Sequence, residues 1–167
     1  MIRQYLTTAF LAAAADQLVK FIIKLQMKLY SSFSVIPGIL DITYIENYGI
    51  AFGLTGQDVS QLKRWLLCGV IFAAIVIIAV YWAKNTRGGF LFDFSIGLIT
   101  GGAAGNLIDR VFRGSVIDFI HLGYKGISLP VFNIADMAVS AGVPLFIIYL
   151  FIKKENAKEA GNASHTV

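Results

Sequence analysis

Two aspartates have surroundings in the sequence that point to chemistry. Asp118 lies inside a short apolar run, residues 116–120 (VIDFI), and Asp136 lies at the head of a long apolar segment. An ionised side chain in or near hydrocarbon costs several kcal/mol unless it is paired or hydrated, so such residues are candidates for function. We therefore interpret Asp118 and Asp136 as a catalytic pair.

A pair of carboxyl groups in a poorly solvated place can activate water. If the two groups lie a few ångströms apart, they cannot both ionise easily, so one holds a proton while the other is charged. The charged group can take a proton from water while the neutral group hydrogen-bonds a scissile carbonyl. Because a coupled pair titrates jointly, the sequence does not say which aspartate has which role.

Other catalytic schemes have little support in the sequence. His121 and His165 are the two histidines, they are far apart, and no His-Glu-x-x-His pattern is present, so we expect no metal site. The serines, among them Ser95, Ser115 and Ser140, do not lie in a nucleophile-elbow sequence. No glycine-rich phosphate loop follows a strand, so we expect neither a nucleotide nor another cofactor.

The elements that position the aspartates must be membrane helices. The chain has 167 residues, of which 57% are hydrophobic and 14% charged, and its mean hydropathy is +0.71. This composition is too apolar for an ordinary soluble domain. A hydrocarbon core of roughly 30 Å takes about 20 helical residues to cross, which leaves room for about four spans in one domain. The cations flank apolar runs, which suits lipid headgroups and argues against nucleic acid.

The predicted fold class is an all-α membrane protein with four transmembrane helices. We place a single domain at residues 1–154 and a polar C-terminal tail, expected to be disordered, at 155–167. The spans are expected at about 4–25, 65–83, 90–109 and 132–152. The first superficially resembles a secretory signal, but its apolar pattern resumes at residues 21–23, so we expect it to remain as a helix.

Two segments between the spans are expected outside the membrane. Residues 39–45 are rich in β-branched side chains and follow a Pro-Gly turn signal, which predicts a strand or hairpin in a small extracytoplasmic platform. Residues 111–131, which include Asp118, are predicted to form a periplasmic loop between the third and fourth helices. In the third span the stretch without charged residues covers only 94–108, which is short for a membrane helix. We therefore expect the polar ends of this span to reach the membrane interfaces.

Residues spaced four apart are expected to share a helix face. Gly97, Gly101 and Gly105 form a small-residue stripe that lets another helix approach closely. Asp16 and Lys20 can partly neutralise each other, and a structural ion pair and a role at the site are equally supported. Asn106 and Arg110 likewise point toward one place near the end of the third helix.

Topology brings the candidate residues together. With four spans both chain ends lie on one side, and the end of the third span and the start of the fourth lie on the other. We therefore expect Asn106, Arg110, Asp118, Asn133 and Asp136 to gather at one membrane face. Lysines and arginines are denser on the side of the chain ends, which favours cytoplasmic termini and an outward-facing site.

Five sequence boxes, in order, resemble those of bacterial lipoprotein signal peptidases (signal peptidase II). They are residues 16–20 (DQLVK), 47–52 (NYGIAF), 101–110 (GGAAGNLIDR), 116–119 (VIDF) and 132–136 (FNIAD). The resemblance implies a four-helix aspartic endopeptidase of the bacterial cytoplasmic (inner) membrane, with its site facing the periplasm or exterior. It further implies cleavage of prolipoproteins just before a diacylglyceryl-modified cysteine. We expect the protein to be a monomer among membrane lipids.

The resemblance also assigns roles by position. Asp118 and Asp136 match the catalytic dyad of the family. The supporting residues of the same boxes are Asp16, Lys20, Asn47, Gly49, Asn106, Asp109, Arg110 and Asn133. One departure is Tyr48-Gly49-Ile50, where the family usually has Thr-Gly-Ala. We expect these bulkier residues to reshape the lip of the pocket and to affect substrate preference.

Two other classes of protein compete with a peptidase. A small proton- or cation-coupled transporter could relay ions through Asp16, Asp118 and Asp136. Transporters usually have broken helices in repeated halves, and we find no repeat here. An interaction subunit would explain the glycine stripe but not the acids. The residues alone support peptidase and transporter equally, and the resemblance favours the peptidase.

Overall fold

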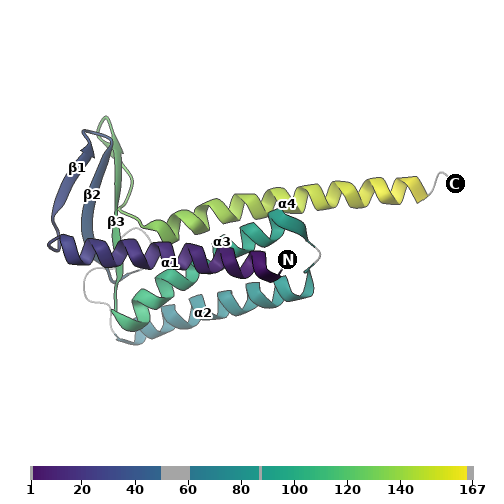
Figure 1. Cartoon of the computed structure of the whole chain (residues 1–167), viewed down its shortest axis with the longest axis horizontal. Helices are drawn as coiled ribbons and strands as arrows, with labels where there is room; N and C mark the ends of the chain where they lie inside the picture. The colour runs from purple at the N-terminus through teal and green to yellow at the C-terminus, as the bar shows by residue number, and fades with distance from the viewer. Residues whose placement is uncertain (1, 50–60, 87, 165–167) are drawn as a thin grey trace.

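The computed structural model describes residues 2–49, 61–86 and 88–164. In chain order its elements are α1 (Ile2–Gln26), β1 (Ser32–Ile36), β2 (Leu40–Asn47), α2 (Gln61–Lys84), α3 (Gly89–Phe112), β3 (Val116–Tyr124), β4 (Ile127–Ser128) and α4 (Ile134–Ser164). The helices run alongside one another and the sheet stands at one end of the bundle, while both chain ends lie toward the other end (Figure 1).

The four predicted spans are confirmed as helices. Within the described residues, the helices long and apolar enough to cross a membrane are Ile2–Gln26, Gln61–Lys84, Gly89–Phe112 and Ile134–Asn156. Large apolar side chains such as Phe10, Val70 and Phe151 are exposed on their outer faces. Such surfaces suit contact with lipid, because a soluble protein rarely exposes large contiguous apolar patches.

α3 is the central helix, and its glycines let α1 and α4 approach it. A Cβ added at Gly101 would lie 2.4 Å from the carbonyl oxygen of Ala9 on α1. On another face of α3, a Cβ at Gly102 would lie 2.4 Å from the carbonyl oxygen of Ala135 on α4. Gly97 and Gly105 also face α1 at such short range. The predicted small-residue stripe is therefore confirmed.

The polar ends of the third span differ from the prediction. α3 runs well beyond residues 94–108, and Asp93 and Asp109 are fully buried instead of lying at its exposed ends. Asp93 accepts a hydrogen bond of 2.9 Å from the indole Nε1 of Trp82, and Asp109 pairs with Lys20. Both carboxylates have partners inside the bundle, although Asp93 Oδ2 is buried without a hydrogen-bond partner among the described residues. A charge therefore does not mark the end of this helix.

The strand expected at residues 39–45 is confirmed, and residues 111–131 connect the third and fourth helices as expected, but the strands within this segment were not predicted. Most of that segment forms β3 and β4, which complete an antiparallel sheet of order β1-β2-β3-β4. β3 pairs with β2 in a register that sets Asp118 opposite Ile45. Because this partner lies some 70 residues away along the chain, local patterning did not reveal the strand.

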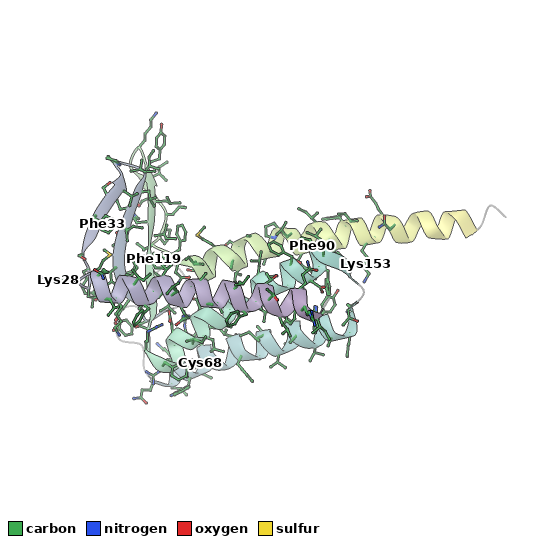
Figure 2. The ribbon with its side chains drawn as sticks, in the orientation of Figure 1. Lys28, Phe33, Cys68, Phe90, Phe119 and Lys153 are labelled. Atoms are coloured by element: carbon green, nitrogen blue, oxygen red, sulfur yellow. The ribbon has the colours of Figure 1, made fainter. Side chains whose placement is uncertain are left out.

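An apolar cluster fixes the sheet to the helices. Ile23 of α1, Tyr44 of β2, and Ile117 and Phe119 of β3 are buried together, at the junction where Figure 2 labels Phe119. Gly114, with a φ of 84°, makes the turn between α3 and β3. This packing places the first half of β3, including Asp118, directly against the helix ends.

The disorder predicted for the C-terminal tail is wrong over residues 155–164, because α4 continues to Ser164; residues 165–167 lie outside the described part of the chain. Residues 153–160 (KKENAKEA) are mostly strong helix formers, and no proline interrupts them. Local helix propensity therefore outweighs the polar composition that suggested disorder.

Candidate active site

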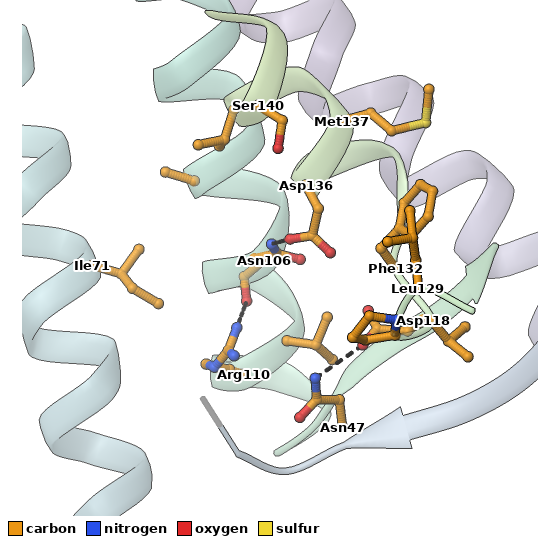
Figure 3. Close-up of a pocket in the computed structure, with 15 residues that line it drawn as sticks. Asn47, Ile71, Asn106, Arg110, Asp118, Leu129, Phe132, Asp136, Met137 and Ser140 are labelled. Carbon is orange, nitrogen blue, oxygen red and sulfur yellow. Dashed lines mark hydrogen bonds between the residues drawn. The ribbon is translucent and has the colours of Figure 1, made fainter. Parts of the chain in front are cut away.

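A cavity of about 620 Å³ opens where the sheet meets the helices. Its polar lining comes from β2 (Asn47), β3 (Asp118), α3 (Asn106, Arg110) and α4 (Asp136, Ser140). Figure 3 shows Asp118 and Asp136 on different elements beside this space, with Ile71 of α2 across from them. The structure thus brings both candidate aspartates to one cavity.

Asp118 lies in the buried first half of β3, deep in this site. Its neighbours Ile117 and Phe119 are buried, and Asp118 itself is 2% exposed. Its Oδ1 accepts a hydrogen bond of 2.6 Å from Asn133 Nδ2, and its Oδ2 accepts one of 3.0 Å from Asn47 Nδ2. Burial, assisted by the charge of Asp136, raises the pKa of Asp118 to about 6, although both amide donors act in the opposite direction.

Asp136 is held in the first turn of α4 by reciprocal capping. The backbone N–H of Asp136 donates to Asn133 Oδ1 at 2.9 Å, and the backbone N–H of Asn133 donates to Asp136 Oδ2 at 3.2 Å. This is the geometry of a capping box. The other oxygen, Oδ1, accepts a hydrogen bond of 2.8 Å from Asn106 Nδ2. Asp136 is half-buried and faces the cavity.

Asn133 connects the two aspartates. Its side chain is fully buried; its Nδ2 donates to Asp118, and it shares the capping box with Asp136. The same Nδ2 lies 3.1 Å from Asn106 Oδ1. Asp118 and Asp136 are therefore joined through one amide, although 18 positions separate them in the sequence.

Arg110 holds the end of β2 against α3. Its Nη2 donates to the carbonyl oxygen of Gly49 at 3.0 Å, and the Gly49 N–H donates to Asn47 Oδ1 at 3.0 Å. This arrangement directs Asn47 Nδ2 toward Asp118. Arg110 and Gly49 thus position Asn47 for its contact with the acid.

The expected lip of the pocket lies only partly within the described residues. Ile50, Ala51 and Phe52 fall in 50–60, outside the part of the chain that the structure describes. The hydroxyl of Tyr48 donates to Glu46 Oε2 at 2.7 Å. This hydrogen bond to the Glu46 carboxylate raises the pKa of Tyr48.

The remaining predicted residues lie behind the cavity in a closed ion cluster. Lys20 is fully buried, with its Nζ 2.7 Å from Asp16 Oδ2 and 2.8 Å from Asp109 Oδ2. Arg113 also pairs with Asp109. Asp16 Oδ1 accepts the backbone N–H of Ala135 at 2.9 Å, which fixes α1 to the start of α4. The predicted ion pair is present, and Lys20 extends it to the site by donating to Asn106 Oδ1 at 3.1 Å.

Sequence reasoning missed two members of this cluster. Gln17 Nε2 donates to Asp109 Oδ1 at 2.9 Å, and Arg113 Nη1 donates to Gln17 Oε1 at 2.9 Å. Arg113 follows Asp109 by four positions, so the spacing rule for helical ion pairs could have found it. The apolar cavity residues, such as Ile71 and Met137, carried no signal in the sequence.

The two groups of acids offer different chemistry. Among the described residues, neither Asp118 nor Asp136 has a lysine, arginine or histidine nitrogen within ion-pair distance, whereas Asp16 and Asp109 do. In the same part of the chain, no group of three histidine, cysteine, aspartate or glutamate side chains could hold a metal ion. The cavity thus offers two carboxyl groups with amide partners, which suits proton transfer to and from a bound water.

Comparison with known proteins gives one family. The family model described as Signal peptidase (SPase) II matches residues 8–152. Among solved structures, the chain resembles a bacterial membrane enzyme determined by the in meso method at 2.3 Å resolution. The two are 34% identical, with 93% of this chain and 92% of the other covered and a TM-score of 0.82. A second bacterial membrane enzyme structure, at 1.9 Å resolution, is 34% identical over 90% and 94% of the two chains, with a TM-score of 0.76.

Proposed function

Because this chain belongs to the signal peptidase II family of multi-pass membrane peptidases that process lipoprotein signal peptides, we propose that it cleaves prolipoproteins by an aspartic mechanism. The cut falls immediately before the diacylglyceryl-modified cysteine. Asp118 and Asp136 are the catalytic residues. The observation that carries the proposal is the pair of carboxyl groups that face one cavity and are bridged by Asn133.

In this mechanism one carboxyl group is charged and the other is protonated. The charged group accepts a proton from a water in the cavity, and the water oxygen attacks the scissile carbonyl carbon. The protonated group donates a hydrogen bond to the carbonyl oxygen as negative charge develops there. Collapse of the tetrahedral intermediate breaks the C–N bond, and a proton passes to the leaving amine.

The walls of the cavity suit an apolar substrate. Ile71 on α2 and Met137 and Val139 on α4 line it beside the acids. The signal segment of a prolipoprotein and the acyl chains on its cysteine are apolar, so these walls bind them, while Arg110 provides a cation near their polar groups. Asn47 and Asn106 hold the carboxyl groups in place during the reaction.

The proposed location is the bacterial cytoplasmic membrane, with the termini in the cytoplasm. Lys84 at the end of α2 and Lys153 and Lys154 on α4 lie at the end of the bundle away from the sheet, where Figure 2 labels Lys153. The positive-inside rule assigns that end to the cytoplasm. The sheet and the cavity then face the periplasm or exterior.

The transporter considered from the sequence is the less favoured candidate. Family membership favours hydrolysis. Of the three acids proposed for an ion relay, Asp16 is already bound to Lys20. The peptidase is therefore the better supported candidate.

An assay of the purified protein in detergent with a diacylglyceryl-modified prolipoprotein tests the proposal. We expect the parent to release the signal peptide, with product masses that place the cut before the modified cysteine. Asp118→Asn and Asp136→Asn should each lose at least about 10³-fold in rate, because either change removes one half of the proton transfer. A variant that retains nearly the parent rate would refute the dyad.

Two further arms of the assay examine the substrate and the mechanism. A prolipoprotein without the lipid should be cut much more slowly. A metal chelator should leave the rate unchanged. Activity that is lost on chelation and restored by zinc would assign the reaction to a metal-dependent class instead.

A further inference from the structure

Lys20 donates one of its hydrogen bonds to a neutral group, the side-chain amide of Asn106. Its ammonium contacts Asp16 Oδ2 at 2.7 Å, Asp109 Oδ2 at 2.8 Å and Asn106 Oδ1 at 3.1 Å. An ammonium has three N–H donors and no acceptor, so these contacts can occupy all of them. The two carboxylates already more than neutralise one lysine. The bond to Asn106 therefore does something other than balance charge.

That bond fixes the orientation of the Asn106 amide. Because Lys20 can only donate, Asn106 must present its oxygen to the ammonium, and Asn133 Nδ2 donates to the same oxygen at 3.1 Å. The Asn106 Nδ2 then points to Asp136 Oδ1 at 2.8 Å. A flipped amide would set its N–H donors against those of Lys20 and Asn133. It would also set its oxygen against the carboxylate of Asp136.

The two aspartates differ in burial and in their place on the fold. Each accepts N–H groups at both oxygens, Asp136 from Asn106 and the Asn133 backbone and Asp118 from Asn133 and Asn47, and such donors favour the charged form of a carboxylate. Asp136 also lies at the N-terminus of α4, where the helix dipole favours negative charge. Asp118 lies deeper, at 2% exposure, where burial opposes charge. The geometry therefore favours a charged Asp136 and a protonated Asp118.

Other charged groups near the pair do not remove this difference. Lys20 of α1 and Arg110 of α3 are cations that act on the pair. The field of Lys20 favours a charged Asp118, but burial outweighs it, since the pKa of Asp118 is still raised. Arg110 interacts with both Asp118 and Asp136, so its field favours charge on each. Asp16 and Asp109 are bound to Lys20, which offsets their charge.

We propose that Lys20 is a positioning residue of the peptidase, which acts through the Asn106 amide to keep Asp136 as the charged base and Asp118 as the proton-bearing acid. This inference rests on the proposed function, and it adds an assignment of roles within the dyad. A merely structural Lys20 would join α1 to α3 through Asp16 and Asp109. Asn106→Leu, which keeps both ion pairs of Lys20, would then leave the dependence of the rate on pH unchanged.

Steady-state kinetics against pH, together with thermal unfolding, separate the two roles. The variants are Lys20→Met and Asn106→Leu, with Lys24→Met as the matched control, because Lys24 is exposed one turn further along α1. We expect Lys20→Met and Asn106→Leu each to lower kcat about 10- to 100-fold with little change in KM, since the base is misoriented. The fall of kcat on the acidic side should move to higher pH. Lys24→Met should match the parent.

A double variant tests whether Lys20 acts through Asn106. If it does, Lys20→Met/Asn106→Leu loses no more kcat than the worse single variant. Should Lys20→Met fail to fold because two buried acids lose their cation, Lys20→Met/Asp16→Met restores the balance of charge. The same shift in the pH profile is expected for that protein. Asn106→Leu leaves both ion pairs of Lys20 in place and reports independently.

Contrary results would overturn the inference in distinct ways. Parent-like kcat and pH profiles in folded Lys20 variants would refute the positioning role, as would losses that multiply in the double variant. If Asp118→Asn and Asp136→Asn are inactive in the same assay, the proposed function survives that failure. If those two variants are active, the proposed function itself fails.

Discussion

Buried acids in this protein occur in two adjacent groups that differ in their partners. In the closed group, Asp16 and Asp109 contact Lys20 at 2.7 and 2.8 Å, and the three side chains are fully buried. In the open group, Asp118 and Asp136 accept hydrogen bonds from asparagine amides and from backbone, and they face a cavity.

The difference shows how one residue type serves two purposes. A carboxylate bound directly to a buried cation stays charged, and removing either partner exposes an uncompensated charge. A carboxyl group held by amides is oriented but can still exchange its proton near neutral pH. The closed group therefore holds helices together, and the open group is suited to catalysis. Asn106 connects the two, through Lys20 on one side and Asp136 on the other.

The largest effect on stability is expected in the closed group. Asp109→Ala leaves both Lys20 and Arg113 without their shared carboxylate and should cost about 3–5 kcal/mol of unfolding free energy. Denaturant unfolding in detergent measures this loss, and Asp118→Asn is the comparison from the open group. If Asp109→Ala costs no more than Asp118→Asn, the distinction between the groups is wrong.

In the open group, a charged carboxylate should lower the stability of the folded protein instead of raising it. The pKa of Asp118 is raised from 3.8 to about 6, so the folded protein binds this proton more tightly than the unfolded chain. Stability from this source is present below pH 4, falls as the pH rises from about 4 to 6, and is absent above. The change is on the order of 3 kcal/mol.

Unfolding measured at several pH values tests that expectation. Asp118→Asn should lack this part of the pH dependence and should be more stable than the parent at pH 8. Glu155→Gln changes an exposed acid on α4 and should keep the parent dependence. A parent and an Asp118→Asn variant with the same pH profile would contradict the burial of this acid.

A smaller loss of stability is expected at Gly105 of α3, which lets Asp16 of the closed group pack closely against this helix. A Cβ at Gly105 would lie 2.7 Å from Asp16 Oδ2 and 3.3 Å from Ala135 Cβ. Gly105→Ala should therefore cost about 1–3 kcal/mol through overpacking. Gly69→Ala on α2 is the control, since nothing lies within 4 Å of its added Cβ. Equal unfolding temperatures for the two variants would show that α1 does not need this close approach.

The smallest effect is expected at the edge of the closed group. The side chain of Arg113 is 24% exposed, and when Arg113 is removed, Lys20 still pairs with Asp109. Arg113→Gln should cost about 1 kcal/mol, the range of a partly solvated ion pair. A loss as large as that of Asp109→Ala would mean that Arg113, and not Lys20, is the main cation of this group.

The features predicted correctly were those set by local pattern. Helical length and composition gave the spans, four-residue spacing gave the glycine stripe, and the parity of the spans brought Asp118 and Asp136 to the same end of the bundle. β3 was missed because its pairing with β2 joins distant parts of the chain. Asp93 and Asp109 were misplaced because a count of apolar residues cannot foresee the buried partners Trp82 and Lys20.

The site was predictable only in its acids and their nearest polar neighbours. The boxes contain Lys20, Asn106 and Asn133, but the contact of Lys20 on α1 with Asn106 on α3, which sets the direction of the Asn106 amide, follows from how the two helices pack. The apolar wall that includes Ile71 follows from how α2 packs against α3, which no local spacing encodes.

The most direct test compares one acid from each group in the same preparations. Turnover of the lipid-modified prolipoprotein and the unfolding temperature are measured for Asp136→Asn and Asp16→Asn beside the parent. We expect Asp136→Asn to be folded and inert, and Asp16→Asn to unfold at a lower temperature while it still cleaves the substrate. An Asp136→Asn variant that cleaves at nearly the parent rate would contradict the assignment of chemistry to the open group.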